Sequence, residues 1–316
     1  MDPVETVLVD EDTTFDLMLA AEQRGHAVYH ALVSQVFVRS GEVFAKARPA
    51  RARRDPQRPI ELAAPEVLPL AEVDAVFVRK DPPFDSVYLW TTLLLEGLRG
   101  RTLVLNDPRG LRDANEKLFA CRFPELNPET LISADKAQIR AFIDEVGGEA
   151  VIKPIDGHGG EGVFALRQGD FNINPIVEAL TRHGQRPCVV QRFLPAVRQG
   201  DKRILLLDGE ALGAILRVPR SEEFRSNIHV GGSVVQSSLD ADDRRIVETL
   251  APVLREHGLY FVGLDVIGGK LTEVNVTSPT GIQQMSRLDG QPLSERVITW
   301  VEARVAAGLL NPLPRS

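Results

Sequence analysis

Residues 260–276 read YFVGLDVIGGKLTEVNV, two runs of strand-forming residues separated by a pair of glycines. Aromatic and β-branched residues are frequent in both runs, at 260–267 and 271–276, as is typical of paired strands. The glycines between them supply the backbone freedom that a tight turn needs. The pattern predicts an antiparallel β-hairpin, and the polar residues on this hairpin are the first candidates for a functional site.

Three polar side chains of the hairpin, Asp265, Glu273 and Asn275, offer hard oxygen ligands that suit Mg²⁺ holding nucleotide phosphates. A two-residue loop would set Asp265 opposite Thr272, so that Asp265 and Glu273 would point to opposite faces. A three-residue loop or a bulge sets Asp265 opposite Glu273 and leaves Asn275 on the same face. We predict this second register, with residues 268–270 as the loop. Taken alone, the pattern also fits the polar outer face of a hairpin, which is the commoner case.

Strand and helix patterns alternate along the rest of the chain. Buried strands are predicted at 75–78 and 102–105, with a helix from about residue 87 between them, which indicates an α/β domain with a parallel sheet. The other predicted elements are a hairpin at 36–44, a strand ending at 153, a hairpin at 203–218, and helices at about 240–257 and 293–306. We expect the last helix to cover the second sheet.

Residues 46–59 are rich in arginine and proline, so this segment could form a basic patch for an anionic surface. We predict a solvated loop instead, because prolines interrupt regular structure and the rest of the chain is acidic.

Arg203, Arg217 and Arg225 lie in or just after the 203–218 hairpin. Their forked, permanently charged side chains suit carboxylates and transferring phosphates. Taken singly, each is better explained by a surface ion pair, and only their common setting makes them candidates.

A glycine-rich segment, KPIDGHGGEG at residues 153–162, follows a predicted strand. Lys153 supplies a cation, and Gly157, Gly159 and Gly160 allow the backbone to approach a phosphate and donate N–H groups. The spacing matches neither GxGxxG nor GxxxxGK[ST], which argues against a Rossmann or P-loop nucleotide site. A phosphate-covering loop and an ordinary glycine-rich turn remain the two interpretations of this segment alone.

Composition excludes several classes of protein. The residues are 43% hydrophobic and 26% charged, which is ordinary for a globular protein. The length of 316 residues is enough for two or three domains. Its net charge of −7 lacks the basic field of a nucleic-acid-binding protein. Cys121 and Cys188 stand far apart, which predicts neither a disulfide framework nor a thiolate metal site and fits the cytoplasm. Neither a signal peptide nor a membrane-length apolar run is recognisable.

Several separated motifs resemble, in order and spacing, the bacterial glutathione synthetase family of ATP-grasp ligases. They are RKDPPFD at 79–85, NEKLF at 115–119, the 153–160 glycine segment, GDKR at 200–203, FVGLD at 261–265 and TEVNVTSPT at 272–280. The resemblance covers nearly the whole chain. It implies an ATP-grasp fold in three parts: an N-terminal Rossmann-like domain at 1–118, a small lid at 119–195 and a larger antiparallel sheet at 196–316.

The resemblance also implies a reaction, in which ATP drives the joining of γ-glutamylcysteine to glycine through an acyl phosphate, giving glutathione, ADP and phosphate. The implied cofactors are two Mg²⁺ ions, which Mn²⁺ can replace, and the implied assembly is a cytoplasmic homotetramer.

Each site residue takes its expected role from the matching motif. Lys117, Lys153 and the glycines of the loop are expected to bind the phosphates of ATP. Gln191, Phe193 and Leu194 are expected to border its adenine, and Asp201 is expected to approach its ribose. Metal is expected at Asp265, Glu273 and Asn275, and the acyl phosphate at Arg203, Arg217 and Arg225. Peptide and glycine are expected to bind Arg79, Ser278, Pro279 and Thr280.

The chain departs from the family pattern at a few positions. His158 replaces a methionine, and Ser226 and His229 replace small residues in a segment, 219–232, that resembles the family's mobile loop. Family members usually have a strand before the Met-Asp-Pro segment with which this chain starts, so we expect a first strand upstream.

Three rival hypotheses stay open on the sequence. They are another ATP-grasp ligase, such as a D-alanyl-D-alanine or glutamate-adding ligase, a non-catalytic nucleotide-binding regulator, and a dinucleotide-dependent oxidoreductase.

Overall fold

The hairpin at 260–276 forms one edge of a five-stranded antiparallel sheet in the computed structural model, which describes residues 1–219 and 233–311. In spatial order the strands are β14 (Ser233–Gln236), β13 (Glu210–Val218), β12 (Asp201–Leu207), β15 (Phe261–Ile267) and β16 (Lys270–Asn275). The β12–β13 pair confirms the second predicted hairpin as well.

The predicted register of the β15–β16 hairpin is confirmed. Asp265 pairs with Glu273, and Gly263 pairs with Asn275, so the two carboxylates lie on neighbouring strands at the same level. Side chains two residues apart on a strand share a face, so Asn275 follows Glu273 on the same face.

The predicted three-residue loop is wrong. Ile267 pairs with Lys270, so the turn contains only Gly268 and Gly269, whose φ angles of 56° and 73° suit a two-residue hairpin turn. The register instead shifts between Asp265 and Val266, which is a β-bulge. Asp265 and Glu273 can face the same side only if one residue is added between them. The bulge adds that residue within the hairpin strands, and the turn keeps two residues.

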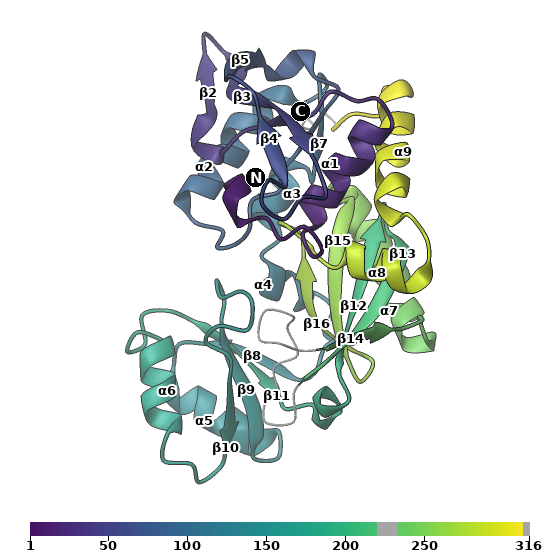
Figure 1. Cartoon of the computed structure of the whole chain (residues 1–316). Helices are drawn as coiled ribbons and strands as arrows, with labels where there is room; N and C mark the ends of the chain where they lie inside the picture. Colours follow the sequence, from purple (N-terminus) through teal and green to yellow (C-terminus); the bar gives the residue numbers. More distant parts are fainter. Residues whose placement is uncertain (220–232, 312–316) are drawn as a thin grey trace.

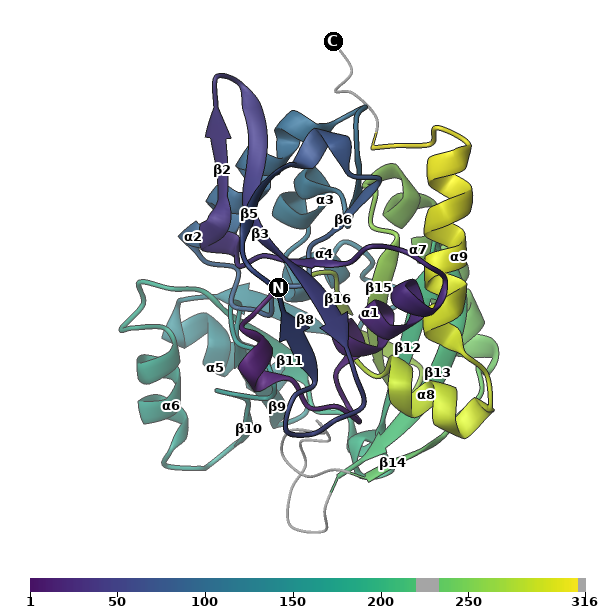
Figure 2. The ribbon, with the colours of Figure 1, turned by 45° about the horizontal axis from the view of Figure 1, so that its top comes forward.

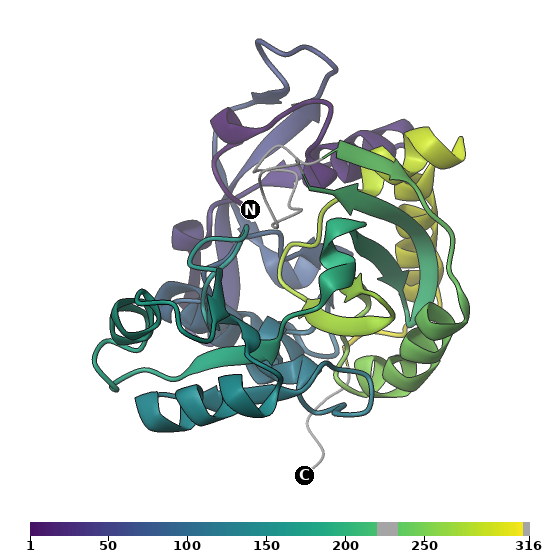
Figure 3. The same ribbon diagram turned by 90° about the horizontal axis from the view of Figure 1, so that it is seen from below.

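Helices cover both faces of this sheet (Figure 3). α7 (Ala241–Glu256) packs on the face that carries Ile204 and Leu206, while α8 (Ile282–Asp289) and α9 (Leu293–Ala306) pack on the face that carries Leu205. Figure 2 shows α9 beside α1 (Thr13–Gln23), along the outside of the sheet. The final helix therefore covers the sheet, as predicted.

A second, smaller antiparallel sheet lies apart from the rest of the chain, at the lower left of Figure 1. Its strands in order are β10 (Phe164–Arg167), β9 (Glu149–Pro154), β11 (Cys188–Arg192) and β8 (Thr130–Ser133). α5 (Lys136–Glu145) and α6 (Ile173–Leu180) share one hydrophobic core with it. The domain boundaries at 118/119 and 195/196 stay a prediction, and both fall between sheets.

The N-terminal part holds the predicted strands β6 (Ala75–Phe77) and β7 (Leu103–Leu105), which pair in parallel. Among the described residues this parallel sheet has two strands, because the other N-terminal strands form an antiparallel sheet. Those strands are β1 (Tyr29–His30), β2 (Val36–Arg39), β3 (Glu42–Ala52), β4 (Ile60–Leu62) and β5 (Glu66–Pro69). The β2–β3 pair confirms the hairpin at 36–44.

The remaining helical elements are short. They are α2 (Ser86–Leu95), α3 (Pro108–Asp113), α4 (Glu116–Ala120) and the 3₁₀ turns η1 (Val4–Thr6), η2 (Val33–Gln35), η3 (Leu70–Glu72), η4 (Glu96–Leu98) and η5 (Pro195–Arg198). Within the described part of the chain, no helix combines the length and the apolar character needed to span a bilayer.

The predicted loop at 46–59 is wrong in its first half, because β3 continues to Ala52. Ala45 and Ala47 are buried, and so are Ala50 and Ala52, so small apolar residues alternate with polar ones in two short stretches of the strand. Arg48 lies over β4, where its side chain donates to the carbonyls of Leu62 and Ala63. The prolines and arginines of the segment concealed this alternation.

Helix α3 joins the N-terminal part to the large sheet through a close contact at Gly110. A Cβ there would lie 2.1 Å from the carbonyl oxygen of His257, so alanine forces the backbones apart. We expect Gly110→Ala to lower the free energy of unfolding by about 1–3 kcal/mol, as overpacking does. Denaturant titration measures this, and Arg109→Ala on the exposed side of the helix should change little. An unchanged midpoint for Gly110→Ala would contradict the contact.

Candidate active site

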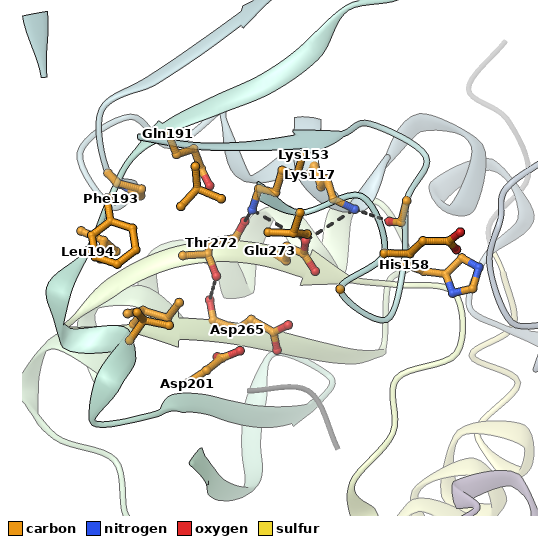
Figure 4. A pocket seen from close by; sticks show the side chains of 18 of the residues that line it. Lys117, Lys153, His158, Gln191, Phe193, Leu194, Asp201, Asp265, Thr272 and Glu273 are labelled. Atoms are coloured by element: carbon orange, nitrogen blue, oxygen red, sulfur yellow. Dashed lines mark hydrogen bonds and ion pairs between the residues drawn. The ribbon is translucent and has the colours of Figure 1, made fainter. Parts of the chain in front are cut away.

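A pocket opens between the small sheet and the large sheet (Figure 4). It encloses about 870 Å³ of empty space, which includes the open mouth of the pocket. Phe193 and Leu194 lie at one end and His158 of the glycine segment at the other. The pocket therefore has an apolar end and an end where a glycine-rich backbone is exposed to a ligand.

Two lysines converge on Glu273 in the middle of the pocket. Lys117 of α4 and Lys153 of β9 place their Nζ atoms 3.5 and 3.7 Å from Oε1 of Glu273. Lys153 also donates to the carbonyl of Thr272 at 3.3 Å, and Lys117 donates to the carbonyl of Gly157. Both lysines are at least nine-tenths buried. Two buried cations against one carboxylate leave a positive centre that suits phosphate oxygens.

Burial and charge act in opposite directions on these groups. Burial lowers the pKa of Lys153, while the charge of Glu273 opposes that shift. Burial disfavours the charged form of Glu273, but Lys117 and Lys153 outweigh it, so the pKa of Glu273 lies below its ordinary value. Glu273 is therefore ionised at neutral pH.

Two arginines hold Asp265 on the neighbouring strand. Arg203 donates from Nε to Oδ1 at 2.5 Å and from Nη2 to Oδ2 at 3.1 Å, a bidentate pair. Arg217 places Nη2 3.0 Å from the same Oδ1 and donates to Asp201. Burial opposes ionisation of Asp265, but the two arginines outweigh it and hold its pKa far below the usual range. Burial raises the pKa of Asp201 to about 7.

The turn at residues 278–280 is held by arginines from two distant parts of the chain. Arg79 donates from Nη2 to the carbonyl of Pro279 at 2.9 Å and from Nε to the hydroxyl of Thr14 at 3.0 Å. Arg203 donates from Nη1 to the carbonyl of Thr280 at 3.3 Å. The same arginine therefore touches both the carboxylate of Asp265 and this turn.

The glycine segment needs glycine for a steric reason at Gly157. A Cβ at this position would lie 2.5 Å from Cγ of Pro154 and 3.1 Å from the carbonyl oxygen of Glu161. Gly159 and Gly160 have φ angles of 61° and 83°, which L side chains rarely adopt. Larger residues would therefore clash at Gly157 and strain the backbone at Gly159 and Gly160.

Most of the predicted site residues line this pocket. They are Lys117, Lys153, Gly157, Gly159, Gly160, Gln191, Phe193, Leu194, Asp201, Asp265 and Glu273. The other described ones surround it: Arg203 and Arg217 contact Asp265, Asn275 donates to the carbonyl of Gly263, and Arg79 contacts the turn of Ser278, Pro279 and Thr280. Arg225, Ser226, His229 and residues 220–232 of the predicted mobile loop lie outside the described residues.

No sequence pattern assigned a role to Thr272 or Glu116, two residues that the structure brings to the site. Thr272 lines the pocket and donates from its hydroxyl to the carbonyl of Asp265 at 3.1 Å, which spans the bulge. Glu116, beside Lys117, accepts hydrogen bonds from Val276 and Thr277 at the start of the turn. In the sequence, Glu116 was marked only by its position next to Lys117, the residue predicted to bind the ATP phosphates.

The donor set fits a divalent cation. The described residues contain no group of three or more His, Cys, Asp or Glu side chains that could hold a metal by themselves. Asp265 and Glu273 lie opposite each other, and Asn275 uses its amide nitrogen within the hairpin, so its oxygen is the atom suited to a metal. Two carboxylates and an amide supply only part of an octahedral shell, and nucleotide phosphates commonly supply the rest.

The chain has the ATP-grasp fold. Two solved structures share the fold: the ATP-grasp ligase PsnB, with a TM-score of 0.60 and 17% identity over 93% of this chain and 94% of that one, and the D-cycloserine synthetase DcsG, with a TM-score of 0.58 and 16% identity over 75% and 86%. At such low identity they show the fold alone.

The family follows from closer matches. The model for the prokaryotic glutathione synthetase N-terminal domain matches residues 1–112, and the model for the ATP-grasp domain of the same enzymes matches residues 116–290. The glutathione synthetase of Gloeobacter violaceus is 47% identical over 95% of this chain and 94% of the relative. That of Brucella melitensis is 43% identical over 96% and 97%. The chain belongs to the prokaryotic glutathione synthetase family.

Membership in this family makes the chain an ATP-dependent, glutathione-forming ligase, and it implies the use of ATP and a divalent metal. The resemblance found in the sequence is thereby confirmed. The family matches favour it over the three rival hypotheses, which were a regulator, an oxidoreductase and another ATP-grasp ligase.

Proposed function

We propose that this chain joins γ-glutamylcysteine to glycine through an acyl phosphate formed in the pocket of Figure 4. A carboxylate is a poor acyl donor, so the cysteinyl carboxylate oxygen first attacks the γ-phosphorus of ATP and ADP leaves. The glycine amine then attacks the acyl carbon, loses a proton and displaces phosphate. The observation that carries the proposal is the adjacency of two centres: the lysines on Glu273 and the arginines on Asp265, one strand apart.

The nucleotide is proposed to lie along the pocket. Lys117 and Lys153 hold its phosphates, and the backbone of Gly157, Gly159 and Gly160 covers them, because these glycines admit close approach of N–H groups. The adenine would lie at the apolar end, against Gln191, Phe193 and Leu194, and the ribose near Asp201. Gln191 is oriented for this by its hydrogen bond to the Thr130 hydroxyl at 3.0 Å.

Asp265, Glu273 and Asn275 are proposed to hold two Mg²⁺ ions, with Mn²⁺ as a substitute. When bound, the metal neutralises charge on the transferring phosphoryl group. The carboxylates support this role, because both are ionised at neutral pH.

Arg203 and Arg217 are proposed to stabilise the acyl phosphate and its tetrahedral successor, together with Arg225. The bidentate contact of Arg203 with Asp265 fixes the direction of its guanidinium group, so little reorganisation is needed when charge develops. Arg79 and the turn of residues 278–280 are proposed to bind the peptide and glycine, since Arg203 bridges this turn and the metal carboxylate.

We further propose a homotetramer in the cytoplasm. Assembly is supported by α2, which exposes 59% of Trp90 and 52% of Leu93 to solvent on one helix. A reducing compartment is supported by the free thiols of Cys121 and Cys188. Light scattering that gives the mass of a monomer would contradict the assembly.

The test is ADP release by the purified chain with ATP and Mg²⁺. Release should require γ-glutamylcysteine and glycine together, and either one alone or D-alanine should give only background. Turnover with D-alanine alone would move the proposal to another acceptor. Nucleotide binding without turnover on any acceptor would refute it.

A further inference from the structure

One short helix touches both the nucleotide pocket and the substrate turn. Helix α4 begins with Glu116 and Lys117 as consecutive residues, after the N-cap Asn115, whose side chain accepts from the N–H groups of Lys117 and Leu118. Lys117 reaches into the pocket, to Glu273 and to the carbonyl of Gly157. The cap fixes the first turn of the helix, so the positions of both side chains are fixed together.

Glu116 points the other way, to the end of β16. Its Oε1 accepts from the hydroxyl of Thr277 at 2.7 Å and from the N–H groups of Val276 and Thr277 at 3.2 and 3.3 Å. Val276 and Thr277 are themselves buried. A buried N–H group that loses its acceptor costs about 1–3 kcal/mol, so the contact restrains this backbone.

The restrained backbone leads directly into the turn of residues 278–280. Beyond Thr277, the carbonyls of Pro279 and Thr280 accept from Arg79 and Arg203. Glu116 therefore holds the beginning of the turn, and the two arginines hold its end.

We propose that Glu116 is a positioning residue that couples nucleotide binding to the binding of γ-glutamylcysteine. The inference rests on the proposed function, in which phosphates bind Lys117 and the peptide binds beside the turn. Phosphates on Lys117 restrain α4, and α4 restrains the turn through Glu116, so the second ligand meets a turn that is already ordered. Two ligands that share one restraint bind with positive cooperativity.

The experiment measures the affinity for γ-glutamylcysteine by calorimetry, with and without a non-hydrolysable ATP analogue and Mg²⁺, together with the KM values and kcat. The variants are Thr277→Val, which removes the hydroxyl with little change of shape, Thr277→Ser, which keeps it, and Glu116→Gln. The control is Thr249→Val on α7, whose hydroxyl, among the residues that the structure describes, bonds only to the carbonyl of Arg245 in its own helix.

In the wild-type chain the analogue should tighten peptide binding. Thr277→Val should reduce that enhancement and raise the peptide KM by about five- to tenfold, the effect of one lost hydrogen bond. Glu116→Gln keeps an oxygen acceptor for the three bonds but loses the charge that strengthens them, so it should reduce the enhancement by a smaller factor. Their nucleotide Kd without peptide should stay within about twofold, and Thr277→Ser should restore the wild-type values.

Peptide affinity that does not respond to the analogue in the wild-type chain would overturn the inference, even with normal turnover. So would a loss in Thr277→Val that affects nucleotide and peptide equally, since that indicates general destabilisation. Failure of the proposed function is distinguishable, because it removes turnover from the wild-type chain with both substrates present.

Discussion

Glu273→Gln is expected to lower kcat by about 10²–10³-fold, the loss typical of one preorganised electrostatic group. Glu273 is the carboxylate on which Lys117 and Lys153 converge, and it is a proposed metal ligand. Glutamine keeps the shape but removes the charge, so the two lysines lose their counter-ion and the proposed metal site loses a charged donor. Steady-state ADP release with both substrates measures the effect.

The matched control for this substitution is Glu178→Gln on α6, where an exposed glutamate pairs with Lys136 at 2.7 Å. An exposed pair contributes about 0–1 kcal/mol to stability, so kcat should stay within about twofold of wild type. Glu273→Gln with full activity would exclude Glu273 as a metal ligand.

Arg203→Lys is expected to lower kcat by about 10²-fold and to reduce stability as well. Arg203 binds both oxygens of the buried Asp265 carboxylate and the carbonyl of Thr280 at once. Lysine keeps the charge, but a single ammonium group cannot reproduce a planar fork of donors. Asp265, the proposed metal ligand, and the turn therefore lose the group that aligns them.

Arg101→Lys is the control for this second prediction, because Arg101 pairs with Glu42 at 2.6 Å on the surface. Its activity and unfolding midpoint should match wild type. To separate catalysis from folding, kcat is measured at a temperature where circular dichroism shows Arg203→Lys to be folded. If kcat of Arg203→Lys equals that of wild type under that condition, Arg203 contributes a structural ion pair and has no role in catalysis.

Local patterns predicted most of the catalytic sheet. The expectation that Asp265 and Glu273 serve one site placed them opposite each other, and the structure confirms this register. Alternation showed that one extra residue was needed between them, because successive side chains of a strand point to opposite faces. The same reasoning failed for the turn, since a bulge and a longer loop restore alternation equally well. It also failed at 46–52, where proline and arginine outweighed the small alternating alanines of β3.

The sequence by itself determined the hairpins, the helix at 293–306, the glycine segment and the family, because these depend on neighbouring residues or on motifs in a fixed order. Only the tertiary structure decided which charges meet. Arg79 contacts Pro279 across 200 residues, and Lys153 contacts Thr272 across 119. Such pairs carry no local signal, since they form only when separate sheets pack together and buried charges must find partners.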